Sequence, residues 1–108
     1  MKSRVVVSEI RAAVQAAQER GSTLYGDAIA GHANEGKLLT VILEQHLGVP
    51  DGYEILPIPA SVLLLSRVLG KINRAVLAGF RIDDYVDAIS YLELAAMARC
   101  KELEDKEG

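Results

Sequence analysis

The sequence predicts an all-α protein, a four-helix bundle made by a single domain over residues 1–108. Half of the residues are hydrophobic, which suits one core in a chain of this length. Gly and Pro divide the chain into four segments with apolar residues near helical spacing, and the connections between them are short. Evidence for strands is weak, since β-branched runs such as Val5-Val6-Val7 in Arg4-Val5-Val6-Val7 are short. We expect a core over about residues 5–101 and a frayed tail over 102–108.

The first two helices are predicted from capping signals. A segment rich in Ala, Gln and Glu runs from Val5 to Arg20 and meets Gly21, a residue suited to a C-terminal cap. Asp27 can accept a hydrogen bond as the N-cap of a second helix, which we expect to end near His46, before the turn residues 47–52.

The third and fourth helices have similar boundaries. Pro59 suits the first turn of a helix from about Ala60 to Ala78, because a first-turn residue needs no N–H partner, and Gly79 suits its end. Asp83 is the predicted N-cap of a helix that continues to about Glu104.

Composition excludes several classes of protein. The net charge of −3 argues against a binder of duplex nucleic acid. A lone Cys100 excludes an intrachain disulfide and favours a reducing, cytoplasmic setting. No apolar run approaches the roughly 18 residues of a membrane span, so we expect no membrane partner. The mean hydropathy of +0.17 is high enough to indicate that a partner subunit covers part of the surface.

Carboxylates interrupt an apolar face of the fourth helix. At about 100° per residue, Asp83, Asp87 and Tyr91 share a stripe with Leu94 and Ala98, and Asp84 lies at its edge. Carboxylates beside a buried groove are costly unless they are paired, capping or bound to a cation. Asp83 and Asp84 have a plain alternative, because acids at a helix N-terminus cap it or favour its dipole.

The second helix shows the same pattern, since His32 and Glu35 lie in an apolar stripe. Glu35 with the acids of the fourth helix could supply oxygen ligands from facing helices, and such ligands favour Mg²⁺ or Mn²⁺. His32 is either an assisting ligand or base, or a hydrogen-bonded core histidine.

The third helix supplies basic residues on one face. Arg67, Lys71 and Arg74 are spaced i, i+4, i+7, and Arg81 follows in the next loop. No acid occurs between Ile55 and Ile82. Such a stripe is either the solvated face of an amphipathic helix or the complement of a magnesium-bound polyphosphate.

These residues resemble a known family. Lys71-Ile72-Asn73-Arg74 followed by Asp83-Asp84-Tyr85-Val86-Asp87-Ala88-Ile89-Ser90-Tyr91 is similar to the C-terminal half of small phage and bacterial MazG-like domains. Glu19-Arg20-Gly21, Tyr25-Gly26-Asp27 and His32 are similar to their first loop and second helix, so the resemblance spans about residues 19–98. It implies a member of the all-α nucleoside triphosphate pyrophosphohydrolases, which are dimers or tetramers and use metal ions.

The family's two acidic motifs are matched unequally. Asp84-x-x-Asp87 corresponds to the second motif, Glu-x-x-Asp, and Asp83 offers an i, i+4 alternative. Of the first motif, Glu-x-x-Glu, only Glu35 is present, since His32 stands three residues before it and Leu38 three after. The chain is therefore either a hydrolase that uses fewer ions or a nucleotide-binding protein without turnover.

The leading hypothesis is Mg²⁺-dependent cleavage of a nucleotide to a monophosphate and pyrophosphate. Glu35 and Asp87 are the expected catalytic residues, and Glu35, Asp83, Asp84 and Asp87 the expected metal ligands. The expected substrate-binding residues are Lys71, Arg74, Arg67, Arg81, Tyr91 and His32, with Tyr25 as a further candidate for the base or ribose. The alternatives are a protein that binds nucleotide or phosphate without cleaving it, and a helical interaction protein whose apolar faces serve only assembly.

Overall fold

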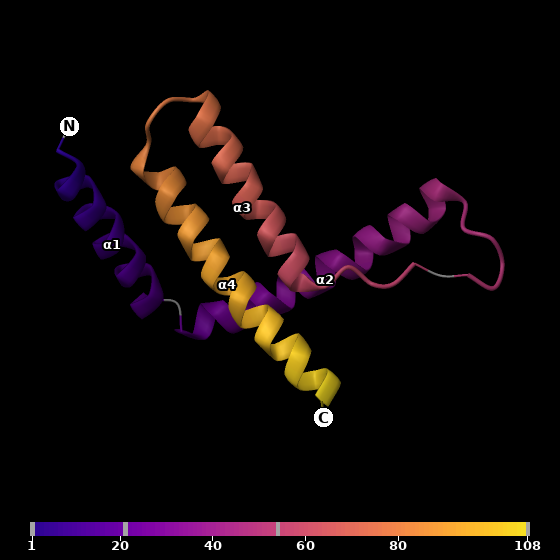
Figure 1. Cartoon of the computed structure of the whole chain (residues 1–108). Helices are drawn as coiled ribbons and strands as arrows, with labels where there is room; N and C mark the ends of the chain where they lie inside the picture. The colour runs from indigo at the N-terminus through magenta and orange to yellow at the C-terminus, as the bar shows by residue number, and fades with distance from the viewer. Residues whose placement is uncertain (1, 21, 54, 108) are drawn as a thin grey trace.

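Four α-helices follow one another in this computed structural model, which describes the backbone of residues 2–20, 22–53 and 55–107 and the side chains of residues 2–19, 27–53 and 55–106. They are α1 (Ser3–Arg20), α2 (Ser22–Leu47), α3 (Ala60–Leu77) and α4 (Ile82–Glu107). Figure 1 shows α1, α4 and α3 side by side, while α2 runs from near the lower end of α1 across α4, past the start of α3 and beyond. The described residues contain no strand, so the predicted all-α class and the number of helices are confirmed.

Two predicted helix starts are wrong. α2 begins at Ser22, so Asp27 lies in its second turn and is not its N-cap. α4 begins at Ile82, which places Asp83 in the first turn together with Asp84, where both acids suit the helix dipole.

α4 also continues to Glu107, so most of the tail that we expected to fray is helical. Gly21, the predicted end of the first helix, lies outside the described residues.

The boundaries of α3 agree with the sequence to within a residue. Pro59 is its N-cap, with φ −72° and ψ 156°, and not a first-turn residue. At the other end Ala78 N donates to Arg74 O over 2.9 Å, and Gly79 then adopts φ +78°, a conformation that residues with a Cβ rarely take. This left-handed glycine reverses the chain into α4.

The core lies where the start of α3 packs against the middle of α4. Leu64 is fully buried, and the small residues packed against it let the two helices approach closely. α4 contacts each of the other three helices, and α3 most extensively. The buried core residues of this cluster are Leu64, Leu94, Ala60, Ala95 and Ala98.

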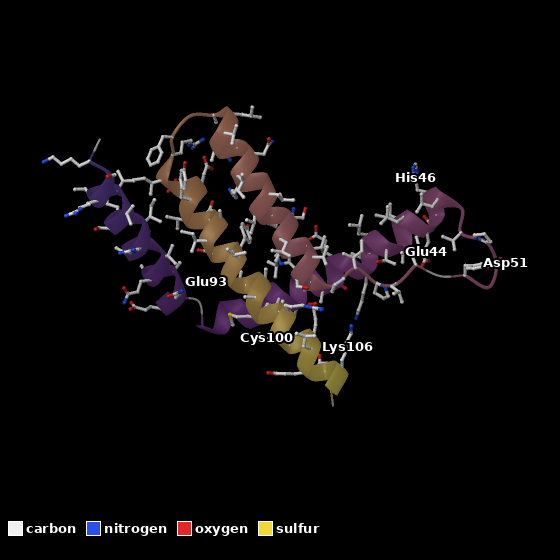
Figure 2. The ribbon with its side chains drawn as sticks, in the orientation of Figure 1. Glu44, His46, Asp51, Glu93, Cys100 and Lys106 are labelled. Atoms are coloured by element: carbon white, nitrogen blue, oxygen red, sulfur yellow. The ribbon has the colours of Figure 1, made fainter. Side chains whose placement is uncertain are left out.

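The outer half of α2 and the connection to α3 form an arm, residues 38–59, that projects from the other helices (Figure 1). The connection folds back on α2, where Ile58 N donates to Thr40 Oγ1 over 3.0 Å and Thr40 Oγ1 donates to Gly36 O over 2.7 Å. Figure 2 places Glu44, His46 and Asp51 in this arm, far from Cys100 on α4. His46 is therefore remote from the crossing of α2 and α4.

No helix, over the residues described, is both long enough and apolar enough to cross a lipid bilayer.

Glu102 of α4 caps the start of α3 from outside. Its carboxylate accepts from Ser61 N over 3.3 Å and from Ser61 Oγ over 2.5 Å, and Ser61 is buried. These bonds satisfy one of the free N–H groups of the first helical turn.

We expect Glu102→Ala to lower the free energy of unfolding by about 2 kcal/mol, because it leaves a buried N–H and a buried hydroxyl without a partner. Urea unfolding measures the loss. Glu104→Ala, which removes an exposed acid from the same helix, is the control and should change stability by less than about 0.5 kcal/mol. Equal effects of the two variants would show that Glu102 does not cap α3.

Candidate functional site

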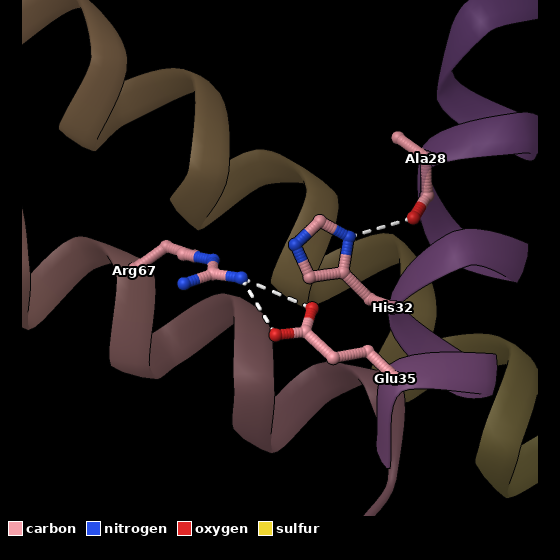
Figure 3. Close-up of polar contacts among 4 residues, drawn as sticks. All are labelled: Ala28, His32, Glu35 and Arg67. Carbon is pink, nitrogen blue, oxygen red and sulfur yellow. Dashed lines mark hydrogen bonds and ion pairs between the residues drawn. The ribbon is translucent and has the colours of Figure 1, made fainter. Parts of the chain in front are cut away.

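Three ion pairs lie in a row along one side of α3. Arg67 Nη2 donates to both carboxylate oxygens of Glu35 on α2, over 2.8 and 3.0 Å (Figure 3). Farther along α3, Lys71 Nζ lies 3.0 Å from Asp87 Oδ2 and Arg74 Nε lies 3.4 Å from Asp84 Oδ1, both on α4. We call these residues the ion-pair row: Arg67, Lys71, Arg74, Glu35, Asp87 and Asp84.

The sequence spacing accounts for the two pairs between α3 and α4. Lys71 and Arg74 are three residues apart on α3, and Asp84 and Asp87 are three residues apart on α4. The turn at Gly79 makes the two helices antiparallel, so the later base meets the earlier acid and the earlier base the later acid. The predicted basic stripe of the third helix therefore faces acids and is not simply solvated.

Two of the three pairs are open to solvent. The Arg67 and Glu35 side chains are 48% and 47% exposed, and Asp87 is 46% exposed. Pairs this exposed contribute about 0–1 kcal/mol to stability. Their bases and acids can therefore take other partners at little cost to the fold.

Asp84 differs from the other acids of the row because it is buried. Its side chain is 3% exposed, Oδ1 faces a half-exposed Arg74, and Oδ2 has no hydrogen-bond partner among the residues that the structure describes. A carboxylate oxygen buried in this way is costly unless a cation or a donor reaches it. The helical projection placed Asp83 on the inner stripe and Asp84 at its edge, whereas in the structure Asp83 is exposed.

His32 stands at the Glu35 end of the row (Figure 3). Its Nδ1 donates to Ala28 O over 2.7 Å, and this bond leaves Nε2 of a neutral ring as a free acceptor. The ring makes an edge contact with Tyr91 of α4, at 6.5 Å between centroids and 70° between planes. His32 and Tyr91, both predicted to bind substrate, thus lie together at the crossing of α2 and α4.

Arg81 and Asp83 are not part of the ion-pair row. They line a hollow of about 690 Å³ between the start of α1 and the α3–α4 turn, together with Lys2, Val5 and Phe80. The side chain of Tyr25 lies outside the described residues.

The arrangement limits which carboxylates can share a metal ion. The partners of Glu35 and Asp84 are Arg67 and Arg74, which are seven residues apart on α3, or about 10 Å at 1.5 Å per residue. Mg²⁺ binds oxygen at about 2.1 Å, so one ion cannot reach both acids as they stand. Within the described part of the chain, no group of three or more His, Cys, Asp or Glu residues lies close enough to hold a metal ion.

Asp84 and Asp87 are the acids that best fit a metal ion. They are separated by one helical turn on α4, and the buried oxygen of Asp84 has no competing partner. Hard carboxylate oxygens are the ligands that Mg²⁺ prefers, and it commonly takes one or two of them together with water and substrate phosphates. A site of this kind needs fewer protein ligands than the four acids predicted from the sequence.

Comparison of the chain with protein-family models, with curated proteins and with solved structures finds no match.

Proposed function

We propose that the protein is a Mg²⁺-dependent nucleotide pyrophosphohydrolase that binds its substrate at the ion-pair row. The observation that carries the proposal is the row itself, in which three bases of α3 face three acids of α2 and α4. Cytoplasmic nucleotides are the expected substrates, and we expect the working form to be a homodimer or homotetramer.

The charge of the row suits a metal–polyphosphate complex better than either component alone. Its three bases and three acids cancel, so it attracts neither a free cation nor a free anion strongly. When both arrive together, the acids can exchange the bases for the metal, and the bases can exchange the acids for phosphate oxygens. Each charged group then keeps a partner of opposite charge throughout binding.

The residues divide naturally into roles. Asp84 and Asp87 would hold Mg²⁺, and a bound Mg²⁺ would polarise the α-phosphoryl group. Lys71, Arg74 and Arg67 would neutralise the phosphates. Glu35, released from Arg67, would accept a proton from the water that attacks the α-phosphorus. The bond from that phosphorus to the bridging oxygen breaks, and pyrophosphate leaves.

His32 and Tyr91 would complete the Glu35 end of the row. The free Nε2 of His32 can accept a hydrogen bond, while the bond to Ala28 O keeps the ring oriented. Tyr91, in edge contact with that ring, offers an aromatic face and a hydroxyl to the base or ribose.

Pyrophosphate release from each dNTP in the presence of Mg²⁺ tests the proposal. We expect Asp87→Ala and Lys71→Ala each to lower the rate by about 100-fold or more, because each removes a charge that the transition state requires. Glu104→Ala and Lys101→Ala remove exposed charges of the same kinds from α4 and should leave the rate unchanged. Wild-type release no faster than that of Asp87→Ala would exclude hydrolysis at the row.

Binding without turnover is a second candidate. It is favoured by the separation of Glu35 from Asp84, because the acids then serve different points along the substrate and no compact multi-metal centre forms. Calorimetry with a nucleotide, first in EDTA and then with Mg²⁺, distinguishes the two functions, because only the second condition allows a metal-dependent hydrolase to turn over. Tight binding with the nucleotide recovered intact supports sequestration. If Glu35→Ala, Asp87→Ala and Lys71→Ala alter neither binding nor thermal shift, the chain is instead a helical interaction protein.

A further inference from the structure

The chain exposes far more surface than a compact chain of its size. Its accessible surface is 7926 Å², about 2,000 Å² more than the roughly 5,900 Å² expected for a folded monomer of 11.7 kDa. Its radius of gyration is 17.0 Å, whereas about 13 Å is typical of 108 residues. The projecting arm accounts for much of this elongation (Figure 1).

Exposed apolar side chains form two strips on this surface. The arm carries Leu38, Val41 and Ile42 on adjacent turns of α2, each more than half exposed. α3 carries a stripe of apolar side chains at helical spacing along its free side, all about half exposed or more. We call it the α3 stripe: Val62, Leu65, Leu69, Ile72 and Val76.

We propose that two copies of this chain associate by exchanging arms, with the arm of each copy lying on the α3 stripe of the other. The area supports a second copy as the occupant. Burying about 2,000 Å² on each chain removes about 4,000 Å² in total, within the roughly 2,000–5,000 Å² of obligate homodimers. A reciprocal exchange also closes after two copies, so both strips are covered without forming a filament.

Charge decides between this arrangement and a contact of arm with arm. Residues 38–59 contain the acids Glu44, Asp51 and Glu54 and no Lys or Arg. α3 contains no acid, and its bases lie on the opposite side from the α3 stripe, in the ion-pair row. Two arms in contact would bring their negative charges together, whereas an arm on the α3 stripe would meet no acid of α3. The inference depends on shape, surface and charge, and it stands whether or not the row cleaves nucleotides.

Sedimentation of the full-length protein without nucleotide is the first test. We expect the wild type to sediment as a dimer, with twice the chain mass of 11.7 kDa. A wild type that is monomeric at high micromolar concentration would overturn the proposal. Ile42→Asp on the arm and Leu69→Asp on the stripe should each weaken association by about 100-fold or more, because each buries an unpaired carboxylate at both contacts. Val7→Asp, on an exposed part of α1, should remain dimeric.

Mixing the two variants tests which strips meet. A mixed dimer of Ile42→Asp and Leu69→Asp chains retains one contact between an unchanged arm and an unchanged stripe, so the mixture should dimerise more tightly than either variant alone. Circular dichroism confirms that the monomeric variants remain helical. If Leu69→Asp stays dimeric, or the mixture stays as monomeric as its components, the arm does not lie on the α3 stripe.

Discussion

Replacing Gly36 with alanine is expected to destabilise the protein by about 3 kcal/mol, although alanine is the better helix former. Gly36 lies inside α2, beneath the returning connection of the arm. A Cβ added there overlaps Ile58 O and lies 3.1 Å from Ile58 C. These are backbone atoms that no rotamer change can move. The connection must lift, and with it goes the bond from Ile58 N to Thr40 Oγ1.

Gly31 provides a matched control because it lies in the same helix and a Cβ added to it would meet no atom of the described residues within 4 Å, apart from its chain neighbours and the nearby backbone of α2 itself. Gly31→Ala should therefore stabilise the protein by about 1 kcal/mol, the usual gain in an open helix interior. Thermal or urea unfolding of the two variants measures effects of opposite sign. Equal stabilisation by both would mean that the connection does not rest on Gly36.

The helices could be predicted from the sequence because their ends depend on local chemistry. Gly79 ends α3 where it was expected to, and Pro59 stands at the start of that helix. The role predicted for Asp27 was wrong because Asp, although favoured as an N-cap, also occurs inside helices, and the preceding backbone decides where the helix begins. The arm could not be predicted, since no local signal tells whether another element covers the end of a helix.

The ion-pair row could be predicted in part. The i, i+3 spacing of Lys71 with Arg74 and of Asp84 with Asp87 fits facing antiparallel helices, and the structure forms both pairs. Periodicity fixes the relative angle between Asp83 and Asp84, but the partner helix fixes which of them turns inward. A helical projection of the sequence therefore favours Asp83, whereas packing against α3 buries Asp84.

The burial of Asp84 lowers the stability of the free protein but suits a residue that binds a cation. A half-exposed Arg74 compensates one of its oxygens, and the other has no partner. The desolvation of a buried charge with incomplete partners commonly costs more free energy than its ion pair contributes. If a cation binds this second oxygen, the folded state becomes more stable when the ligand binds. The unpaired oxygen thus links the stability of the helix pair to occupation of the proposed metal site.

Asp84→Asn separates these two effects. Without added metal, we expect the variant to be more stable than the wild type by about 1 kcal/mol, or roughly 5 °C in Tm, because it no longer buries a charge. Mg²⁺ added together with a nucleotide should raise the Tm of the wild type but not that of the variant, because the ion-pair row suits the metal–polyphosphate complex better than the free ion. Differential scanning calorimetry with and without Mg²⁺ and nucleotide measures both.

Asp83→Asn is the control, since it removes the same charge from an exposed position in the same helical turn. It should behave like the wild type in both measurements, because water already solvates the exposed carboxylate of Asp83. If Asp83→Asn loses the Mg²⁺ response and Asp84→Asn retains it, the ion binds beside Arg81 in the hollow near α1, and the acids of the ion-pair row serve only to hold α3 against its neighbours.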